Sequence, residues 1–86
     1  MDFEYDRAKS ASNKKKHGID FIEAQAIWTD IDRLELPGIS DDEQRALIIG
    51  RISDKCWTAV ITHRNDRIRI ISARRARVGE IKLYES

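Results

Sequence analysis

The sequence predicts a single α+β domain, in which a short N-terminal strand and two helices pack on an antiparallel β-sheet and a short helix ends the chain. Helix signals fill the first third, where polar capping residues precede apolar residues at helical spacing. Runs of β-branched residues separated by short polar turns follow them. The 86 residues suit one compact domain, 1–86, and leave no room for a second. We expect the helices to cover one face of the sheet.

The N-terminal segment is expected to form a strand and then a helix. Residues 2–5 alternate between acidic and aromatic side chains, as a strand with one buried face does. Asp6 is a favourable N-cap for a helix that runs from Arg7 to about His17. Gly18 follows, in a position where helices often end in a left-handed turn.

A second helix is predicted to start near Asp20, because Glu23 three residues later completes a pattern that resembles a capping box. Its buried face would hold Phe21, Ala24, Ile27 and Trp28. Pro37-Gly38 and Ser40-Asp41-Asp42 then mark turns.

Strands dominate the rest of the chain and are predicted at residues 31–36, 46–52, 57–63 and 67–72. Arg64-Asn65-Asp66 is expected to join the last two as a tight hairpin connection. In the final strand, Ile68 and Ile70 should lie on one face, and Arg67, Arg69 and Ile71 on the other. Residues 76–85 are expected to form a short helix, which Gly79 weakens.

Composition excludes several classes of protein. The start of the chain has no basic region followed by an apolar run, so no signal peptide is expected. No apolar run approaches the length needed to cross a bilayer. The single cysteine, Cys56, permits no internal disulfide, which suits the reducing cytoplasm. Because Cys56 lies in an apolar strand, we expect it to be inert in the core rather than a nucleophile.

The net charge of +1 hides an asymmetry along the chain. Residues 20–45 hold eight acidic and two basic residues, whereas residues 64–82 hold seven basic and two acidic ones. We interpret the acidic stretch as a solvated surface. The basic end could still attract a polyanion, because the local field and not the total charge governs encounter.

No metal or cofactor site is expected. The soft and imidazole ligands are Cys56, His17 and His63, and their spacing matches no metal motif. The acidic residues form no recognisable two-metal cluster, and a glycine-rich phosphate loop is absent from the sequence.

Cationic side chains are the best candidates for chemistry. Guanidinium groups grip phosphate bidentately, and several on one site would stabilise the extra charge of a phosphorane-like transition state. The candidates are Arg64, Arg67, Arg69, Arg74, Arg75 and Arg77, with Lys14, Lys15, Lys16 and His17 at the end of the first helix. Metal-free RNA cleavage also needs groups that take the proton of the 2′-hydroxyl and protonate the leaving 5′-oxygen. The available proton handlers are His17, His63, Tyr84 and a lysine.

Each candidate also has a structural explanation. The lysine run and His17 could only favour the negative pole of the helix dipole. His63 alternates with Ile61 and could be a satisfied, partly buried histidine, and Tyr84 could only seat the last helix. The arginine-rich end is harder to explain in this way, although spacing alone leaves RNA, DNA and an acidic protein surface open as its partner.

Two motifs resemble the BrnT family of toxins. The first comprises Asp6, Lys9, Asn13 and Lys16-His17-Gly18, continued by residues 20–24. The second comprises residues 67–76, followed by Glu80 and Tyr84. The similarity covers nearly the whole chain and is weakest between Ile31 and Asp42. The two motifs in this order and at this separation are quite specific.

This resemblance implies a RelE-like fold and a metal-independent endoribonuclease, the toxin half of a type II toxin–antitoxin pair that arrests translation when free. It also implies a BrnA-like ribbon-helix-helix antitoxin as partner, and contact with operator DNA only through the antitoxin complex. A non-catalytic nucleic-acid-binding module and a protein-interaction subunit remain the alternatives.

The family-matched positions suggest a set of roles. Arg64, Arg74 and Arg75 would bind and stabilise the scissile phosphate. Lys16 and His17 would handle a proton or the adjacent phosphate.

Supporting roles fall to other matched positions. Glu80 and Tyr84 would orient or assist, and Arg69 would extend the RNA track. Further RNA contacts would come from Lys14, Lys15, Arg67 and Arg77. Many relatives place a threonine or serine where Arg77 stands, so the last helix lacks its usual cap here.

Overall fold

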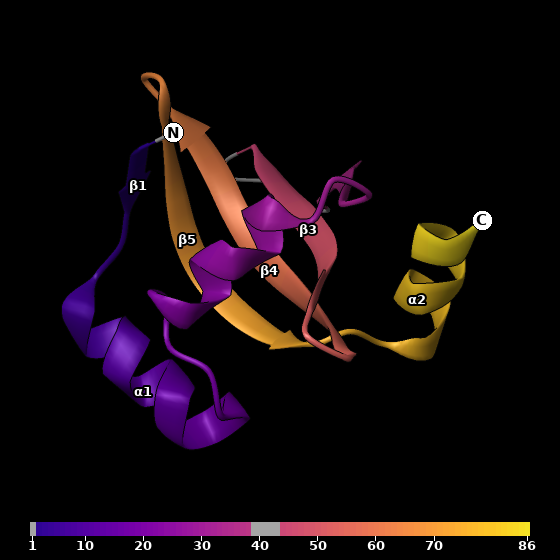
Figure 1. Ribbon diagram of the computed structural model, residues 1–86. Coiled ribbons are helices and arrows are strands. Elements are labelled where there is room, and N and C mark those ends of the chain that lie inside the picture. Colours follow the sequence, from indigo (N-terminus) through magenta and orange to yellow (C-terminus); the bar gives the residue numbers. More distant parts are fainter. Residues whose placement is uncertain (1, 39–43) are drawn as a thin grey trace.

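The computed structural model describes residues 2–38 and 44–86, and Figure 1 shows their arrangement. In chain order, its elements are β1 (Asp2–Glu4), α1 (Arg7–His17), the 3-10 helix η1 (Glu23–Thr29), β2 (Leu34–Pro37), β3 (Arg45–Ile52), β4 (Lys55–Arg64), β5 (Arg67–Arg75) and α2 (Val78–Glu85). The predicted α+β class is confirmed. The predicted turn at Ser40-Asp41-Asp42 lies outside the described residues. Within them, neither α1 nor α2 is long and apolar enough to cross a membrane.

The strands form one sheet in the order β1-β5-β4-β3-β2. Strands β2 to β5 pair antiparallel, as predicted. In contrast, β1 pairs parallel to β5, with Phe3 opposite Ile68 and Glu4 opposite Arg69. Alternation within residues 2–5 predicts a strand but not its partner, so the pairing of β1 with β5 at the sheet edge was not predicted.

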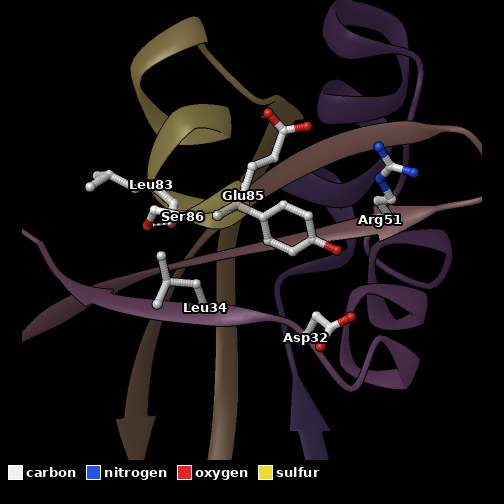
Figure 2. Close-up of a pocket in the computed structure, with 7 residues that line it drawn as sticks. Asp32, Leu34, Arg51, Leu83, Glu85 and Ser86 are labelled. Carbon is white, nitrogen blue, oxygen red and sulfur yellow. Dashed lines mark hydrogen bonds between the residues drawn. The ribbon is translucent and has the colours of Figure 1, made fainter.

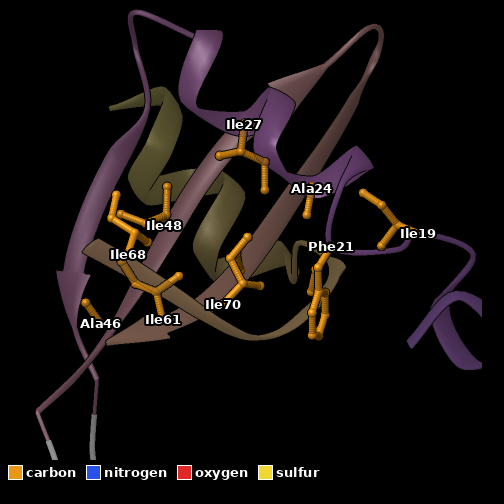
Figure 3. Close-up of a cluster of buried hydrophobic side chains, with 11 residues drawn as sticks. Ile19, Phe21, Ala24, Ile27, Ala46, Ile48, Ile61, Ile68 and Ile70 are labelled. Atoms are coloured by element: carbon orange, nitrogen blue, oxygen red, sulfur yellow. The ribbon is translucent and has the colours of Figure 1, made fainter. Parts of the chain in front are cut away.

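One face of the sheet, here called the helix face, carries the hydrophobic core under η1 and the segment that precedes it (Figure 3), and α1 packs beside β5 on this face. Its buried residues include Ala46 and Ile48 of β3, Ala59 and Ile61 of β4, and Ile68, Ile70 and Ala73 of β5. They pack against Phe21, Ala24 and Ile27 from above. This burial of aliphatic surface is the main source of stability for so small a domain.

The second helix is a 3-10 helix that begins at Glu23, not the α-helix expected from Asp20. The predicted capping box is present, because the Glu23 N–H donates to Asp20 Oδ1 (2.7 Å) and the Asp20 N–H donates to Glu23 Oε1 (3.0 Å). With three residues per turn, Ala24 and Ile27 face the sheet together, and both are fully buried. Gly50 of β3 makes this approach possible, since a Cβ there would lie 2.9 Å from Ile27 Cγ2.

The strand predicted at residues 31–36 begins later, at Leu34. The Asp30 side chain accepts a hydrogen bond from the Asp32 N–H (2.8 Å), and the Arg33 N–H donates to Asp30 O (3.2 Å). These bonds fold residues 31–33 into a turn. Pro37 is the last residue of β2, and it is tolerated because β2 is an edge strand.

The hairpin between β4 and β5 has the predicted connection. Only Asn65 and Asp66 separate the two strands, and both have positive φ angles, 46° and 64°. Asn and Asp tolerate this left-handed backbone, which matches the twist of the flanking strands.

A β-bulge divides β5 into two halves. Ile61 pairs with Ile70 and Val60 pairs with Ser72, so Ile71 is an extra residue in the ladder. The alternation predicted for residues 67–70 is therefore confirmed but breaks at Ile71. Arg69 and Arg74 are five residues apart, an interval that would put them on opposite faces of a regular strand. Because of the bulge, they lie on the same face. We call this the arginine face; Arg69 and Arg74 pair there with Thr62 and Thr58.

The expectation that all helices cover one face is wrong for α2. Glu80 of α2 bonds to Thr58 and Arg74, so this helix starts over the arginine face. It also starts at Val78 rather than Ala76, because the Ala76 N–H donates to Cys56 O (2.9 Å) and prolongs the sheet. Arg77 makes no side-chain cap, as its residue type predicts, but its N–H donates to Glu80 Oε1 (2.8 Å).

Candidate functional site

The predicted cations separate into groups at the two ends of β5. Arg64, Arg67 and Arg69 lie near its start, and Arg74 and Arg75 lie at its end. At about 3.3 Å per residue, Arg69 and Arg74 are about 15 Å apart along the strand. The roles inferred from the sequence required one phosphate to contact both Arg64 and Arg74. Arg64 lies beyond Arg69, still further from Arg74, so a single phosphate cannot contact both.

A carboxylate stands among the arginines at the start of β5. Glu4 of β1 lies 3.9 Å from Arg64 Nε, 3.9 Å from Arg67 Nη1 and 4.0 Å from Arg69 Nη1. We call these four residues the Glu4 cluster. All three separations exceed hydrogen-bond length, so the guanidinium donors are not used up by Glu4. Three positive charges face one negative charge, which leaves the cluster strongly cationic.

The Glu4 cluster is accessible to a ligand. The side chains of Arg64 and Arg67 are 58% and 60% exposed, and that of Arg69 is 33% exposed. Glu4, Arg64, Asn65 and Arg67 line a hollow of about 300 Å³. This volume is at the lower end of the range for small-molecule sites.

Sequence reasoning did not identify Glu4 as a functional residue. The alternation of residues 2–5 placed its side chain opposite Phe3 and Tyr5, but gave it no partner. Only the parallel register that sets Glu4 beside Arg69 reveals the cluster. No local sequence signal encodes that register.

At the other end of β5, Arg74 is held by Glu80. Two hydrogen bonds of 2.8 Å join Nη1 to Oε1 and Nη2 to Oε2, and Thr58 Oγ1 donates to Oε1 at 2.9 Å. The Arg74 guanidinium lowers the pKa of Glu80 to about 2, and the Glu80 carboxylate raises that of Arg74. Glu80 is thus too weak a base for proton transfer near neutral pH, and it orients Arg74 instead.

Tyr84 is separated from the arginines and bonds to Asp30. Its hydroxyl donates to Asp30 Oδ2 at 2.5 Å, which raises the pKa of Tyr84 to about 12. Burial opposes ionisation of Asp30, but hydrogen bonds from Tyr84 and from the Arg51 N–H outweigh it and lower the Asp30 pKa. Tyr84 therefore joins α2 to the end of η1, beside a hollow of about 710 Å³ that Leu34, Arg51 and Leu83 help to line (Figure 2).

The lysine and histidine side chains at the end of α1 lie away from Arg64. Figure 1 shows α1 running beside β5 in the same direction. Asn13 fixes this position, because its Nδ2 donates to Ala73 O (2.9 Å) and its Oδ1 accepts from the Ala73 N–H (3.2 Å). Lys16 and His17 follow one turn later, toward the end of β5. Within the described ranges, no hydrogen bond or ion pair joins either of them to an arginine.

Two further predicted contacts have partners. Lys14 Nζ bonds to Glu23 Oε1 at 2.7 Å, a hydrogen bond that raises the pKa of Lys14. The Arg75 guanidinium lies 5.5 Å from the ring centroid of Trp57, to which it is paired on the helix face. Arg74 and Arg75 therefore point to opposite faces of the sheet.

His63 and Cys56 behave largely as the structural explanations predicted. His63 Nε2 lies 3.0 Å from Glu35 Oε2, so the ring has a partner, but its side chain is 57% exposed rather than partly buried. Burial raises the pKa of the half-buried Cys56 thiol, which keeps it protonated and unreactive near neutral pH.

Comparison with known families places this chain in a class of proteins. The family model that matches describes ribonuclease toxins of type II toxin–antitoxin systems. The match is to BrnT, over residues 5–80, and the chain belongs to the BrnT family. The matched region begins directly after Glu4 and ends at Glu80. No curated relative matches the chain.

Proposed function

We propose that this chain is a metal-independent endoribonuclease that binds the RNA backbone at the Glu4 cluster, and that its cleavage of RNA arrests translation. The observation that carries the proposal is the set of three guanidinium groups within 4.0 Å of one carboxylate. Arg64, Arg67 and Arg69 keep their hydrogen-bond donors available, unlike Arg74, whose fork is occupied by Glu80.

The arginines supply electrostatic stabilisation. Cleavage by attack of the ribose 2′-oxygen places an extra negative charge on the phosphate in the transition state. Fixed guanidinium groups that face this charge stabilise the transition state more than the ground state. DNA lacks the attacking hydroxyl and would be bound but not cut.

A single RNA strand would run along β5 on the arginine face. The bulge at Ile71 supports this path, because it turns Arg69 and Arg74 to the same side of the sheet. The strand would meet the Glu4 cluster first and Arg74 about 15 Å further on. Arg77, two residues beyond the end of β5, would contact the RNA past Arg74. Lys16 and His17 end α1 over the helix face and would contact only RNA that continues around the end of the sheet. Lys14, Lys15 and Arg75 would contribute to long-range attraction.

The partner implied by the family is an antitoxin. We propose a BrnA-like ribbon-helix-helix protein that neutralises the toxin in the cytoplasm and binds operator DNA on behalf of the complex. The acidic stretch and the basic end of this chain would allow electrostatic steering between the two proteins.

Incubation of the purified chain with labelled RNA in EDTA tests the proposal. We expect cleavage without divalent metal, and no cleavage of DNA of the same sequence. Arg64→Ala and Arg69→Ala should each slow cleavage by about 100-fold, in line with the loss of one group that stabilises the transition state. Lys55→Ala, at the exposed first residue of β4, is the matched control and should cleave like the parent.

Two results would overturn the proposal. RNA that is bound but remains intact would identify a non-catalytic binding module, whose affinity falls steeply with salt. Full cleavage by both arginine variants would show that the Glu4 cluster is not the site.

A further inference from the structure

We propose that Glu4 is the general base of the cleavage reaction, the group that removes the proton from the attacking 2′-hydroxyl. This inference rests on the proposed ribonuclease function and assigns a residue outside the region that the family match covers. It follows from comparing the two carboxylates that lie beside arginines on the arginine face, Glu4 and Glu80.

The two carboxylates differ in how many of their lone pairs are occupied. Glu80 accepts hydrogen bonds from Arg74, Thr58 and the Arg77 N–H. Glu4 is 3.9–4.0 Å from its arginines and accepts no hydrogen bond from a residue that the structure describes. A general base must be able to accept a new hydrogen bond from substrate, and Glu4 meets this requirement.

The backbone that carries Glu4 is held in place by contacts of β1 with the rest of the domain. β1 pairs with β5, and the neighbouring Phe3 ring packs edge-on against Trp28 with centroids 4.8 Å apart. These contacts fix the strand, so the Glu4 side chain, 27% exposed, faces the hollow from a rigid backbone. A proton acceptor on a rigid element loses little entropy when substrate binds.

A bound phosphate would bring the 2′-hydroxyl to Glu4. Arginine nitrogens bind phosphate oxygens at about 2.7–2.9 Å. In Arg64 and Arg67 these nitrogens are 3.9 Å from Glu4, so a phosphate held by either side chain would lie directly beside the carboxylate. The 2′-hydroxyl is on the sugar carbon next to the one that bears the phosphate, which places it within hydrogen-bond reach. The three positive charges offset the repulsion between carboxylate and phosphate.

The step balances with one water molecule. Glu4 takes the 2′-hydroxyl proton, the 2′-oxygen bonds to phosphorus, and the bond from phosphorus to the 5′-oxygen breaks. Its electron pair goes to the 5′-oxygen, which takes a proton from water. The hydroxide so formed removes the proton from Glu4. The products are a 2′,3′-cyclic phosphate and a 5′-hydroxyl end.

The test is Glu4→Gln in the full chain, with cleavage and binding measured separately. Cleavage should fall about 100-fold or more, as is usual for loss of a general base. Binding to a 2′-O-methyl RNA, which cannot react, should be unchanged or tighter because a negative charge has been removed. Glu4→Asp should restore part of the activity. The matched control is Asp2→Asn, which removes a carboxylate from the same face of β1 and should cleave within a few-fold of the parent.

The pH profile separates a base from a structural carboxylate. Charged groups that face Glu4 are Asp2 on β1, Arg64 on β4, and Arg67 and Arg69 on β5. Cleavage by the parent should lose its activity at acid pH through one carboxyl group, and Glu4→Gln should lack this acid limb.

Several outcomes contradict the inference. Cleavage by Glu4→Gln within a few-fold of the parent rules out Glu4 as base while leaving the arginine site intact. Parallel loss of binding and cleavage would assign Glu4 a structural role. If the parent itself fails to cleave RNA, the proposed function fails before Glu4 is tested.

Discussion

Arg74 and Glu80 form a bidentate pair with two hydrogen bonds of 2.8 Å, and this pair fastens α2 to the end of β5. α2 has no fully buried residue of its own, so its position depends on a few polar contacts. The side chains of the pair are only 20% and 13% exposed. Removing one partner leaves the other charge poorly solvated, which makes such pairs sensitive to single substitutions.

We expect Glu80→Gln to destabilise the protein by about 1–3 kcal/mol, because Arg74 loses a charged partner and its Nη2 loses the second acceptor oxygen. Urea unfolding followed by circular dichroism would measure the change. Glu85→Gln removes an exposed carboxylate of the same helix and should have little effect. Equal stability of the two variants would show that the pair does not hold α2.

Stability should fall in acid through Glu80. Its pKa is lowered from 4.5 to about 2 in the folded chain, mainly by Arg74. A lowered pKa means that the folded state favours the ionised carboxylate, so this stabilisation is fully present above pH 4.5 and is lost as the pH falls from 4.5 toward 2. The midpoint of unfolding measured across this range should drop less in Glu80→Gln than in the parent; equal slopes would refute the assignment.

Tyr84→Phe should lower stability without abolishing RNA cleavage. The variant loses the hydrogen bond to Asp30, at a cost of about 0.5–1.5 kcal/mol, but keeps the ring against β3. Thermal unfolding and the EDTA cleavage assay check the two halves of this prediction. A loss of cleavage greater than about 10-fold in a folded Tyr84→Phe would contradict this prediction and show that Tyr84 takes part in the reaction.

Asn13→Ala should be among the most damaging polar substitutions. The Asn13 amide bonds to both the N–H and the C=O of Ala73 and to Ile19 O (2.8 Å), so its loss leaves buried backbone groups without partners. We expect a cost of about 2–4 kcal/mol by chemical unfolding. Ser12→Ala, an exposed position on the same helix, provides the control.

Two glycines should respond to alanine in opposite directions. Gly50→Ala places a methyl group 2.9 Å from Ile27 Cγ2 and should cost about 1–3 kcal/mol. A methyl group at Gly79 meets no atom within 4 Å, so Gly79→Ala should raise helix stability by about 0.5–1 kcal/mol. Thermal unfolding of the two variants measures both effects, and a stabilising Gly50→Ala would contradict the close contact between η1 and β3.

Local chemistry in the sequence was enough to predict the features that depend on neighbouring residues. Asp6 caps α1 through the N–H groups of Ala8 and Lys9, and Asn65-Asp66 forms the hairpin turn. The capping box at Asp20 and Glu23 is also present. Each of these features is decided within a few residues of the chain.

Features that depend on distant residues escaped prediction. Nothing in residues 2–5 specifies a parallel pairing with β5, and this pairing is what places Glu4 among arginines. The bulge at Ile71 adds one unpaired residue to a run that alternates normally, and regular alternation continued to residue 74 would have put Arg74 and Arg69 on opposite faces. The candidate residues were therefore mostly identified by type, but their grouping was not.

The most direct test of the account is an RNA substrate with a single 2′-deoxy nucleotide at the cleavage position, incubated with the chain in EDTA. We predict that this one change blocks cleavage there, while the all-ribose RNA yields 2′,3′-cyclic phosphate and 5′-hydroxyl ends. Cleavage at the deoxy position, or products with 5′-phosphate ends, would contradict attack by the 2′-hydroxyl at the arginine site.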